Sequence, residues 1–341
     1  MTTGQRPFIV PVFLPHQGCP HRCVFCDQTA ITGQKKNLSA SDLQNHVRRY
    51  LDFKGKKRGA TQIAFYGGNF LGLDKEILLP LLRAAAAFVE QGLVHGIRFS
   101  TRPDTITEEK LDLLKIFPVT TIEVGIQSMD DRVLEKARRG HTADQSARAL
   151  LLLKKTGYET GAQLMTGLPG DDGQASVETA EKMGILKPDF ARIYPTLVIA
   201  GSPLARLYRQ GEYVPQSPDE AVAVVKTMCL TLESQGITVI RMGLQPTEEL
   251  ADSATLLAGP YHPAFGHRVR SEILFDRVSA LIAGQRPSPG ADLTLAVHPR
   301  QASTLRGLRN VNLKRLKQIF GLELIQVKED PTLAENQIAC Q

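Results

Sequence analysis

Residues 121–127 read TIEVGIQ, and their alternation of apolar and polar side chains is that of a β-strand with two unlike faces. One face carries Ile122, Val124 and Ile126, and the other carries Glu123, Gly125 and Gln127. In a barrel of strands the apolar face packs under the surrounding helices, so Glu123 and Gln127 are expected to point inward. A polar inward face indicates a lined cavity instead of an inert, filled barrel.

Five further runs of apolar and β-branched residues have the length of strands, namely FIVPVFLP (8–15), TQIAFY (61–66), IRFST (97–101), TGAQLM (160–165) and FARIYP (190–195). Amphipathic stretches lie between them, and helix start signals such as Ser39, Asp74 and Thr107 precede several. Strands that alternate with helices predict βαβ crossovers and a parallel sheet. We therefore expect an α/β fold in which residues 1–245 form a partial (β/α)6 TIM-like barrel, with its chemistry at the carboxyl ends of the strands.

Three of the chain's five cysteines lie within residues 16–28, HQGCPHRCVFCDQ, at Cys19, Cys23 and Cys26. An odd number of cysteines, with the other two far apart, does not fit a disulfide framework. Thiolates at the spacing C-x3-C-x2-C suit an iron–sulfur cluster or a zinc ion, because both bind soft sulfur ligands. For zinc, His16 or His21 would supply a fourth ligand. The triplet by itself leaves both alternatives open.

This cysteine loop resembles the signature of the radical S-adenosylmethionine (SAM) superfamily, C-x3-C-x-aromatic-C directly after a first strand. Cys19, Cys23, Phe25 and Cys26 fit it, and residues 8–15 are the strand before them. The resemblance implies a 4Fe–4S cluster on the three cysteines, with one iron left open to bind the amino and carboxylate groups of SAM. It also implies a one-electron reductant of the ferredoxin or flavodoxin type, and cleavage of SAM to methionine and a 5′-deoxyadenosyl radical that abstracts hydrogen from a substrate. Phe25 is placed to pack against what binds the open iron.

Two glycine-containing segments match further parts of the superfamily. YGGNF follows the second predicted strand, where the family places a Gly-Gly segment against the SAM amino group, and this implies Gly67, Gly68 and Asn69 as contacts. MTGLPG follows the fifth, where the family meets the adenine, and this implies Met165. Glycine permits the close backbone approach that such contacts need. Each segment alone is also typical of an ordinary strand-ending turn.

The closer resemblance is to the radical SAM domain of the Elongator catalytic subunit and its bacterial relatives. Five segments look like those of that subfamily and occur in its order: YGGNF, STRPD (100–104), EVGIQS (123–128), RRGHT (138–142) and RIYPTLVIAGS (192–202). The resemblance covers residues 8–245 and implies that Gln127 and Ser128 lie near the SAM ribose. It implies that Arg102 and Arg192 meet the SAM carboxylate or an anionic substrate, with ordinary ion-pair arginines as the alternative.

Two differences from Elongator limit what the resemblance implies. Elongator subunits have a wider cysteine spacing, so the cysteine loop here is similar to the broader superfamily. Nothing after residue 245 reads as a second large α/β unit with an acetyl-coenzyme A loop. We therefore do not expect acetyl transfer.

Beyond residue 245 the alternation of strands and helices stops. Residues 246–285 are expected to form a connecting loop and helix that face the substrate. Within GPYHPAFGHRVRSE, Tyr261, His262 and His267 are candidates to donate a proton or hydrogen atom, or to bind substrate. Hydrogen-bonded loop histidines are the alternative.

Residues 286–341 are expected to form a small, basic α/β appendage. A strand, a turn at Gly307-Leu308-Arg309-Asn310, a basic helix and a second strand resemble a KH-type RNA module, whose Gly-x-x-Gly loop clamps nucleotides. Asn310 stands in place of the second glycine. A plain capping appendage is the alternative.

The 341 residues carry a net charge of +6, and the excess lies at the two ends. Residues 1–60 hold ten Lys or Arg against three Asp or Glu, and residues 268–341 hold eleven against seven. Basic ends suit an anionic partner such as RNA. No apolar run approaches the ~18 residues that span a bilayer, and no signal peptide is recognisable, so we expect a cytoplasmic protein without a membrane partner.

The sequence thus predicts a radical SAM enzyme whose substrate is RNA, such as tRNA. Two alternatives stay open. One is a radical SAM enzyme for a small molecule such as a porphyrin-type precursor. The other is an RNA-binding protein that keeps a zinc or cluster fold without turnover.

Overall fold

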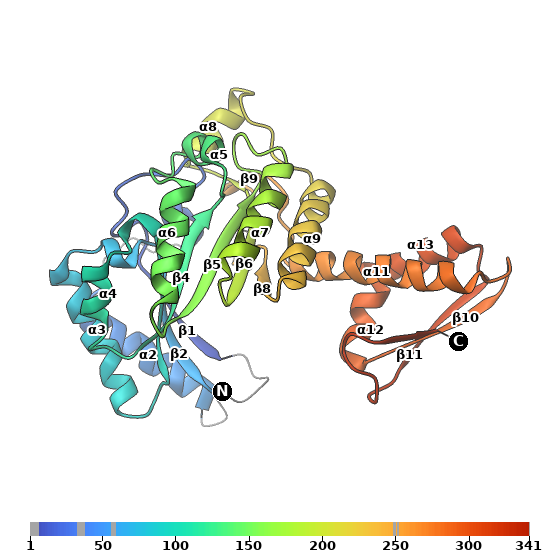
Figure 1. The fold of residues 1–341 in the computed structure, drawn as a ribbon, viewed down its shortest axis with the longest axis horizontal. Coiled ribbons are helices and arrows are strands. Elements are labelled where there is room, and N and C mark those ends of the chain that lie inside the picture. The colour runs from blue at the N-terminus through green and yellow to red at the C-terminus, as the bar shows by residue number, and fades with distance from the viewer. Residues whose placement is uncertain (1–6, 33–37, 56–58, 248–249, 251, 341) are drawn as a thin grey trace. The chain divides into compact units, whose positions relative to one another are not determined.

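The computed structural model describes residues 7–32, 38–55, 59–247, 250 and 252–340. Contacts within the chain divide it into two compact units, Met1–Tyr261 and His262–Gln341, which are described in turn (Figure 1). No helix in the described ranges is long and apolar enough to cross a bilayer.

The first unit is built on a parallel sheet whose strands follow the order of the chain. The strands are β1 (Phe8–Phe13), β2 (Thr61–Tyr66), β3 (Gly96–Thr101), β4 (Val119–Gln127), β5 (Glu159–Thr166), β6 (Phe190–Pro195) and β8 (Thr238–Met242). Every neighbouring pair is parallel. The predicted partial α/β barrel is confirmed, and each of its six predicted strands is present. The sequence did not predict β8, because only Val239 of its five residues is buried and its apolar pattern is weak.

Helices join successive strands and pack against the sheet. They are α1 (Gln28–Thr32), α2 (Ala40–Lys54), η2 (Phe70–Gly72), α3 (Lys75–Glu90), η3 (Pro103–Thr105), α4 (Glu108–Leu114), α5 (Asp131–Lys136), α6 (Ala143–Lys154), α7 (Gln174–Leu186), α8 (Pro203–Arg209) and α9 (Pro218–Ser234). Helix α6 contacts β4 and β5, α7 contacts β5, and α9 contacts β5 and β6 (Figure 1). Ser39 and Thr107 are N-caps as predicted, since each accepts a hydrogen bond from a first-turn N–H. Asp74 is the N-cap residue of α3 without such a bond.

A short antiparallel ribbon adds to the first unit after the sixth strand. It consists of β7 (Val198–Ile199) and β9 (Leu256–Ala258). Leu197, Ile199 and Leu250 form a small buried cluster beside it. The start of the segment predicted as a connection, residues 246–285, therefore packs as part of the first unit.

Charged side chains gather around Glu123 in the interior of the sheet. The fully buried carboxylate lies 3.0 Å from Nη1 of Arg98 and 2.7 Å from Nε of Arg192. The Tyr66 hydroxyl and the Gln163 amide donate hydrogen bonds to it, at 3.2 and 2.9 Å. Tyr66 is on β2 and Arg192 on β6, which are separated by three strands in the sheet, so the sheet curls around this carboxylate. The predicted inward direction of Glu123 agrees with these contacts.

The pKa of Glu123 depends on two opposing effects. Burial alone would raise it, but the guanidinium groups of Arg192 and Arg98 outweigh burial and hold the pKa below its ordinary value. The carboxylate is therefore charged at neutral pH. On the opposite face of the same strand, Ile122, Val124 and Ile126 are fully buried, as the alternation predicted.

The second unit combines one long helix with a small mixed α/β fold. Its elements are α11 (Phe265–Gln285), β10 (Asp292–Val297), α12 (Pro299–Arg306), η4 (Leu308–Asn310), α13 (Val311–Phe320), β11 (Leu324–Glu329) and β12 (Ile338–Cys340). Strand β10 is central, parallel to β11 and antiparallel to β12. Leu274, Val278 and Ile282 of α11 share one buried core with Leu295 of β10 and Leu316 of α13.

The compact units differ from the predicted division at residues 245 and 285. They divide between Tyr261 and His262, because α11 contributes its apolar side chains to the core of the C-terminal unit. The sequence predicted a helix within residues 246–285, but it did not predict that this helix packs into the core of the C-terminal unit. The three-part functional division stays a prediction.

The Glu123 ion pairs yield a stability prediction. Glu123→Gln leaves Arg98 and Arg192 buried without their shared carboxylate, and we expect the free energy of unfolding to fall by about 3–5 kcal/mol. The matched control is Glu159→Gln. Glu159 also pairs with Arg98, at 3.4 Å, but its side chain is 49% exposed, and its loss is expected to cost less than about 1 kcal/mol. Urea denaturation followed by circular dichroism measures both, and equal losses would contradict this account of the barrel interior.

Candidate metal and cofactor site

The three clustered cysteines lie in the loop between β1 and α1, at the carboxyl end of the sheet. Cys23 is buried, and Cys19 and Cys26 are half-buried. Burial raises the pKa of Cys26 to about 12, and the nearby thiols of Cys23 and Cys19 add to the rise. Burial and Cys23 likewise raise the pKa of Cys19. The structure thus brings the three thiols close enough to oppose one another's ionisation, which is a setting that a bound metal cation would relieve.

The two histidines of the loop have partners within the protein. Nε2 of His16 accepts a hydrogen bond from the backbone N–H of Gln28 at 3.0 Å, and burial lowers the pKa of His16. The ring of His21 lies directly against Gly140, where a Cβ atom would overlap it. Within the described ranges, no three His, Cys, Asp or Glu side chains converge tightly enough to hold one metal ion. Ligation of zinc by His16 or His21 stays a prediction.

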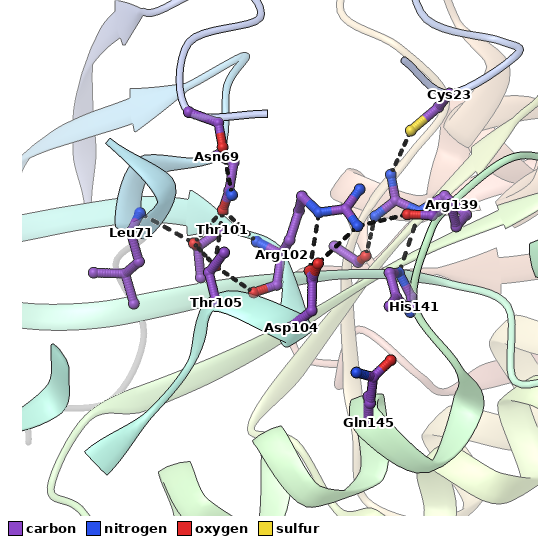
Figure 2. A network of polar contacts seen from close by, with 12 residues as sticks. Cys23, Asn69, Leu71, Thr101, Arg102, Asp104, Thr105, Arg139, His141 and Gln145 are labelled. Atoms are coloured by element: carbon purple, nitrogen blue, oxygen red, sulfur yellow. Dashed lines mark hydrogen bonds and ion pairs between the residues drawn. The ribbon is translucent and has the colours of Figure 1, made fainter. Parts of the chain in front are cut away.

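The side chain of Asn69 connects the cysteine loop to the end of β3 (Figure 2). Its Oδ1 accepts hydrogen bonds from Thr101 Oγ1 at 2.7 Å, from Thr105 Oγ1 at 2.9 Å and from the backbone N–H of Arg102 at 2.9 Å. Its Nδ2 donates to the carbonyl of Gly18 at 2.8 Å. Asn69 is fully buried, and its side chain positions the cysteine loop against the end of β3. Its contact with SAM stays a prediction.

Two glycines allow the YGGNF segment and the cysteine loop to pack backbone against backbone. Gly18 has a φ of +70°, and a Cβ there would overlap the carbonyl of Asn69. A Cβ on Gly68 would lie 2.5 Å from the carbonyl oxygens of Leu14 and Gln17. Gly68 therefore permits a close backbone approach to the cysteine loop. Contact of Gly67 and Gly68 with SAM stays a prediction.

A buried arginine, Arg139, lies directly beside a cysteine (Figure 2). Its Nη1 donates to Sγ of Cys23 at 3.0 Å, and its Nη2 donates to the carbonyl of Gly125 at 2.6 Å. The guanidinium carbon lies 6.0 Å from the centre of the Phe25 ring. Burial and Arg139 lower the pKa of His141 to about 4, so this imidazole is neutral and accepts a hydrogen bond from Nε of Arg139 at 3.3 Å.

Arg102 forms a second buried cation next to Arg139. Its guanidinium donates two hydrogen bonds of 2.9 Å to Asp104, and its Nη2 also donates to the carbonyl of Arg139 at 2.5 Å. Its Nη1 is buried and has no hydrogen-bond partner among the described residues. A buried guanidinium nitrogen without a partner is costly, unless a ligand supplies an acceptor.

Gln127 and Ser128 lie at the carboxyl end of β4, on the same side as the cysteine loop. Gln127 has a φ of +69°, which is rare for a residue other than glycine and marks a strained strand end. The open side of Gly125 faces Nε2 of Gln127 and Nη2 of Arg139, 3.1 and 3.5 Å from where a Cβ atom would lie. The structure therefore brings Gln127 beside the buried arginine.

Apolar side chains form a wall beside the cysteine loop. Val24, Leu168, Val198 and Leu204 are buried together there, and the predicted site residues Phe25 and Met165 pack against them. The following residues 167–171 line a cavity of about 450 Å³ together with Lys136 and Tyr213. The structure thus brings together the aromatic residue of the cysteine motif and the segment after β5.

Comparisons with known proteins identify the family. The sequence model of the radical SAM superfamily matches residues 13–183. The model of the radical SAM C-terminal domain matches residues 188–274. The chain belongs to the radical SAM superfamily. It is therefore an enzyme of the radical SAM class.

Curated relatives confirm the resemblance to Elongator-like proteins. The chain is 29% identical over 232 residues to an uncharacterised protein of Methanocaldococcus jannaschii, covering 65% of this chain and 70% of that protein. It is 34% identical over 257 residues to the tRNA uridine(34) acetyltransferase of the same organism, covering 64% and 47%. Elongator complex protein 3 of Homo sapiens is 32% identical over 179 residues, covering 47% and 33%. The chain thus spans about half the length of the acetyltransferase.

Two solved structures share the fold of this radical SAM protein. Methanocaldococcus infernus Elp3 with an N-terminal deletion has a TM-score of 0.61 and 18% identity, covering 83% of this chain and 68% of that one. Escherichia coli coproporphyrinogen III oxidase, a radical SAM enzyme, has a TM-score of 0.50 and 18% identity, covering 68% and 54%. At such identities the likeness shows the fold alone.

Two predicted site residues, Arg192 and Tyr261, have other contacts in the first unit, and two more belong to the second unit. Arg192 is ion-paired with Glu123 in the sheet interior, which is the alternative reading that the sequence left open. Tyr261 packs against the Leu197, Ile199 and Leu250 cluster. His262 and His267 belong to the second unit, where Nδ1 of His262 accepts a hydrogen bond from the backbone N–H of Ala264 at 3.0 Å. Roles for the two histidines and for Tyr261 in catalysis stay predictions.

Sequence reasoning missed Arg139 and the positioning role of Asn69. Arg139 lies in the RRGHT segment, which was noted for its resemblance alone and given no role. Two neighbouring arginines cannot be told apart in the sequence. The structure shows that Arg138 is exposed and that Arg139 is buried against a cysteine.

The Asn69 contacts predict how the cysteine loop responds to mutation. Asn69→Ala leaves the Arg102 N–H and the Gly18 carbonyl without partners, and we expect the free energy of unfolding to fall by about 2–5 kcal/mol. We also expect the loop to bind less iron after anaerobic reconstitution, as measured by iron and sulfide analysis. Asn45→Ala, at an exposed position of α2, is the control and should change neither value. Normal iron binding by the Asn69 variant would refute its positioning role.

Proposed function

We propose that this radical SAM protein holds a 4Fe–4S cluster on Cys19, Cys23 and Cys26, binds SAM beside it, and modifies an RNA substrate of the tRNA class. When bound, the cluster and SAM together supply one-electron cleavage of SAM to methionine and a 5′-deoxyadenosyl radical, which abstracts hydrogen from the substrate. A ferredoxin or flavodoxin would provide the electron, and a cytoplasmic location belongs to the same proposal.

The observation that carries the proposal is the set of three thiols beside two buried arginines. Soft sulfur ligands suit iron–sulfur chemistry, and three of them leave one iron of a four-iron cluster free. The Nη1 of Arg139 donates a hydrogen bond to Sγ of Cys23 at 3.0 Å, so a buried cation lies beside one of the three sulfur ligands. The donor set therefore fits the cluster.

The neighbouring residues fit SAM as well. The unpartnered Nη1 of Arg102 supplies a donor for a carboxylate in a place from which water is largely excluded. Phe25 and Met165 offer apolar surface for an adenine ring. Gln127, held at the end of β4 by a strained backbone, offers an amide for a ribose hydroxyl.

The tRNA substrate is proposed from the relatives. A tRNA uridine(34) acetyltransferase is 34% identical over 64% of this chain. The basic ends of the chain also suit a polyanion. The small-molecule alternative has only the fold likeness to coproporphyrinogen III oxidase in its favour, so we favour RNA. Acetyl transfer is not part of the proposal.

Single cysteine substitutions test the proposed cluster. Anaerobically reconstituted and reduced wild-type protein should release 5′-deoxyadenosine from SAM. Cys19→Ser, Cys23→Ser and Cys26→Ser should each reduce this release to background, because each removes one iron ligand. Cys340→Ser removes a thiol of the second unit and should leave the release unchanged. Stoichiometric zinc with no 5′-deoxyadenosine from the wild type would refute the proposal.

The Cys23→Ser variant also tests the proposal that tRNA is the substrate. Nucleoside analysis of tRNA from a strain that lacks this gene should reveal a missing modification. The wild-type gene should restore it, and the Cys23→Ser gene should not. Unchanged tRNA nucleosides in the deletion strain would exclude tRNA and favour another substrate class.

Arg139 is the residue whose loss should weaken SAM binding. Arg139→Gln removes a buried cation and its hydrogen bond to Cys23 next to the proposed cofactor. We expect a ten- to hundredfold higher Kd for SAM, since a charged hydrogen bond of this kind contributes about 1.5–3 kcal/mol to the site. Arg139→Lys keeps the charge and should recover part of the affinity. Arg138→Gln is the matched control at the exposed neighbour. Calorimetric titration of the reconstituted protein measures all three, and equal affinities for SAM would contradict a role of Arg139.

A further inference from the structure

The second unit places a turn between two helices that follow one strand and precede another. The order is β10, α12, the turn Gly307-Leu308-Arg309-Asn310, α13 and β11, with β10 parallel to β11. The predicted turn therefore lies where the loop of a KH-type module lies, between two consecutive helices. The helix before the turn, α12 (Pro299–Arg306), was not resolved by the sequence pattern.

The backbone of this turn explains why asparagine replaces the second glycine. Gly307 has a φ of +67° and a ψ of 175°, a conformation that is essentially confined to glycine. Asn310 has a φ of +60° and a ψ of 28°, in the left-handed region. Asparagine enters that region more readily than most residues with a side chain. The turn therefore keeps a glycine-like conformation at both of its ends.

The helix–turn–helix segment 298–320 is strongly basic. It holds six Lys or Arg and no Asp or Glu. Three of its cations have acidic partners in the same unit: Arg300 with Glu335 and Arg315 with Glu272, both at 2.6 Å, and Arg306 with Glu329 at 3.9 Å. The other three are Arg309, Lys314 and Lys317, and no acidic partner is found for them among the described residues.

The three unpaired cations lie on and next to the turn. Arg309 is part of it, with an exposed side chain. Lys314 and Lys317 follow Asn310 at spacings of four and seven residues, which places them on the face of α13 that continues from the turn. Leu316, on another face of the helix, is fully buried in the core. Arg309 and Lys314 are exposed and Lys317 is half-buried, so the three cations lie at the surface next to the turn.

The first turn of α13 adds to this positive field. It contains no acidic residue, and the side chain of Asn310 makes no capping hydrogen bond. The amino end of a ten-residue helix carries partial positive charge and suits phosphate. Leu308 and Val311, beside the turn, are 56% and 43% exposed, and they offer apolar surface next to the cations. Positive charge binds phosphate groups, and apolar surface contacts unstacked bases or riboses, so this combination suits single-stranded RNA.

We propose that the 307–310 turn and the face of α13 with Lys314 and Lys317 form a docking surface for single-stranded RNA. The inference rests on the proposed RNA substrate and assigns its binding to this surface. The cations would meet the phosphates, and Leu308 and Val311 would contact riboses or bases. A chain of phosphates complements three adjacent cations that have no acidic partners.

Charge reversal tests the docking surface in the full-length protein. The probe is a fluorescent single-stranded RNA of about a dozen nucleotides, longer than the four that a KH-type loop clamps. The variant Arg309→Glu/Lys314→Glu/Lys317→Glu should raise the Kd at least about tenfold at 0.1 M salt. The slope of log Kd against log salt should fall by about 2, since each lost phosphate contact removes about 0.7. Fluorescence anisotropy across a salt series measures both quantities.

The matched control reverses three exposed cations of the first unit, Arg48→Glu/Arg49→Glu/Arg83→Glu, and changes the net charge equally. It should retain the wild-type slope within about 0.5, less than the ~0.7 of one contact. A neutral variant, Arg309→Gln/Lys314→Gln/Lys317→Gln, removes the same three cations without adding negative charge and should show the same loss of slope. Thermal melting followed by circular dichroism checks that each variant is folded.

The outcomes separate the two proposals. If the wild type binds the RNA and the turn variants bind as the control does, the docking surface is wrong and the RNA substrate stands. If the turn variants and the control weaken equally, the attraction is one of net charge, and the surface is again wrong. If the wild type does not bind the RNA in low salt, the proposed RNA substrate itself fails.

Discussion

One buried amide, that of Asn69, connects the cysteine loop to the carboxyl end of the sheet. Ordering a loop residue costs about 1–2 kcal/mol in backbone entropy, and a loop that carries three thiols must be held by contacts outside itself. Asn69 provides them, by bonding Gly18 on one side and Thr101, Thr105 and the Arg102 N–H on the other. The glycines at 18 and 68 allow the backbones to approach closely enough for this connection.

The buried arginines of the first unit lie in two places, in the interior of the sheet and at its carboxyl end beside the cysteine loop. Arg98 and Arg192 both pair with Glu123 in the interior, where both oxygens of that carboxylate have partners, and Arg98 also pairs with Glu159. At the carboxyl end of the strands, Arg139 donates to a thiol and Arg102 keeps one guanidinium nitrogen without a partner. The interior is therefore a closed ionic framework, and the end of the barrel retains positive potential for an anionic ligand.

Much of the fold could be predicted because strand signals are local. The predicted first and last residues agree with the structure for two strands, Thr61–Tyr66 and Phe190–Pro195. Both are short, mostly buried runs between clear turns. Strand β8 was missed because its neighbours bury only Val239. The core into which α11 packs could not be predicted either. An apolar stripe shows that a helix has a buried face, but it does not identify the residues that cover that face. Arg192 and Arg102 looked alike in the sequence, yet Arg192 pairs with Glu123 in the sheet interior and Arg102 pairs with Asp104 beside Arg139.

By itself, the sequence determined the parallel α/β barrel, the cysteine triplet and the family, because alternation and motif spacing are properties of neighbouring residues. Only the tertiary structure decided which side chains hold the site together. Asn69 meets Gly18 across 51 positions, and Arg139 meets Cys23 across 116. Even HQGCPHRCVFCDQ, where the thiols are adjacent, leaves open what sets their charge. That depends on the tertiary structure, which buries Cys26 and brings the thiols together, so that the pKa values of Cys19 and Cys26 rise, while Arg139 from a distant loop donates to Cys23.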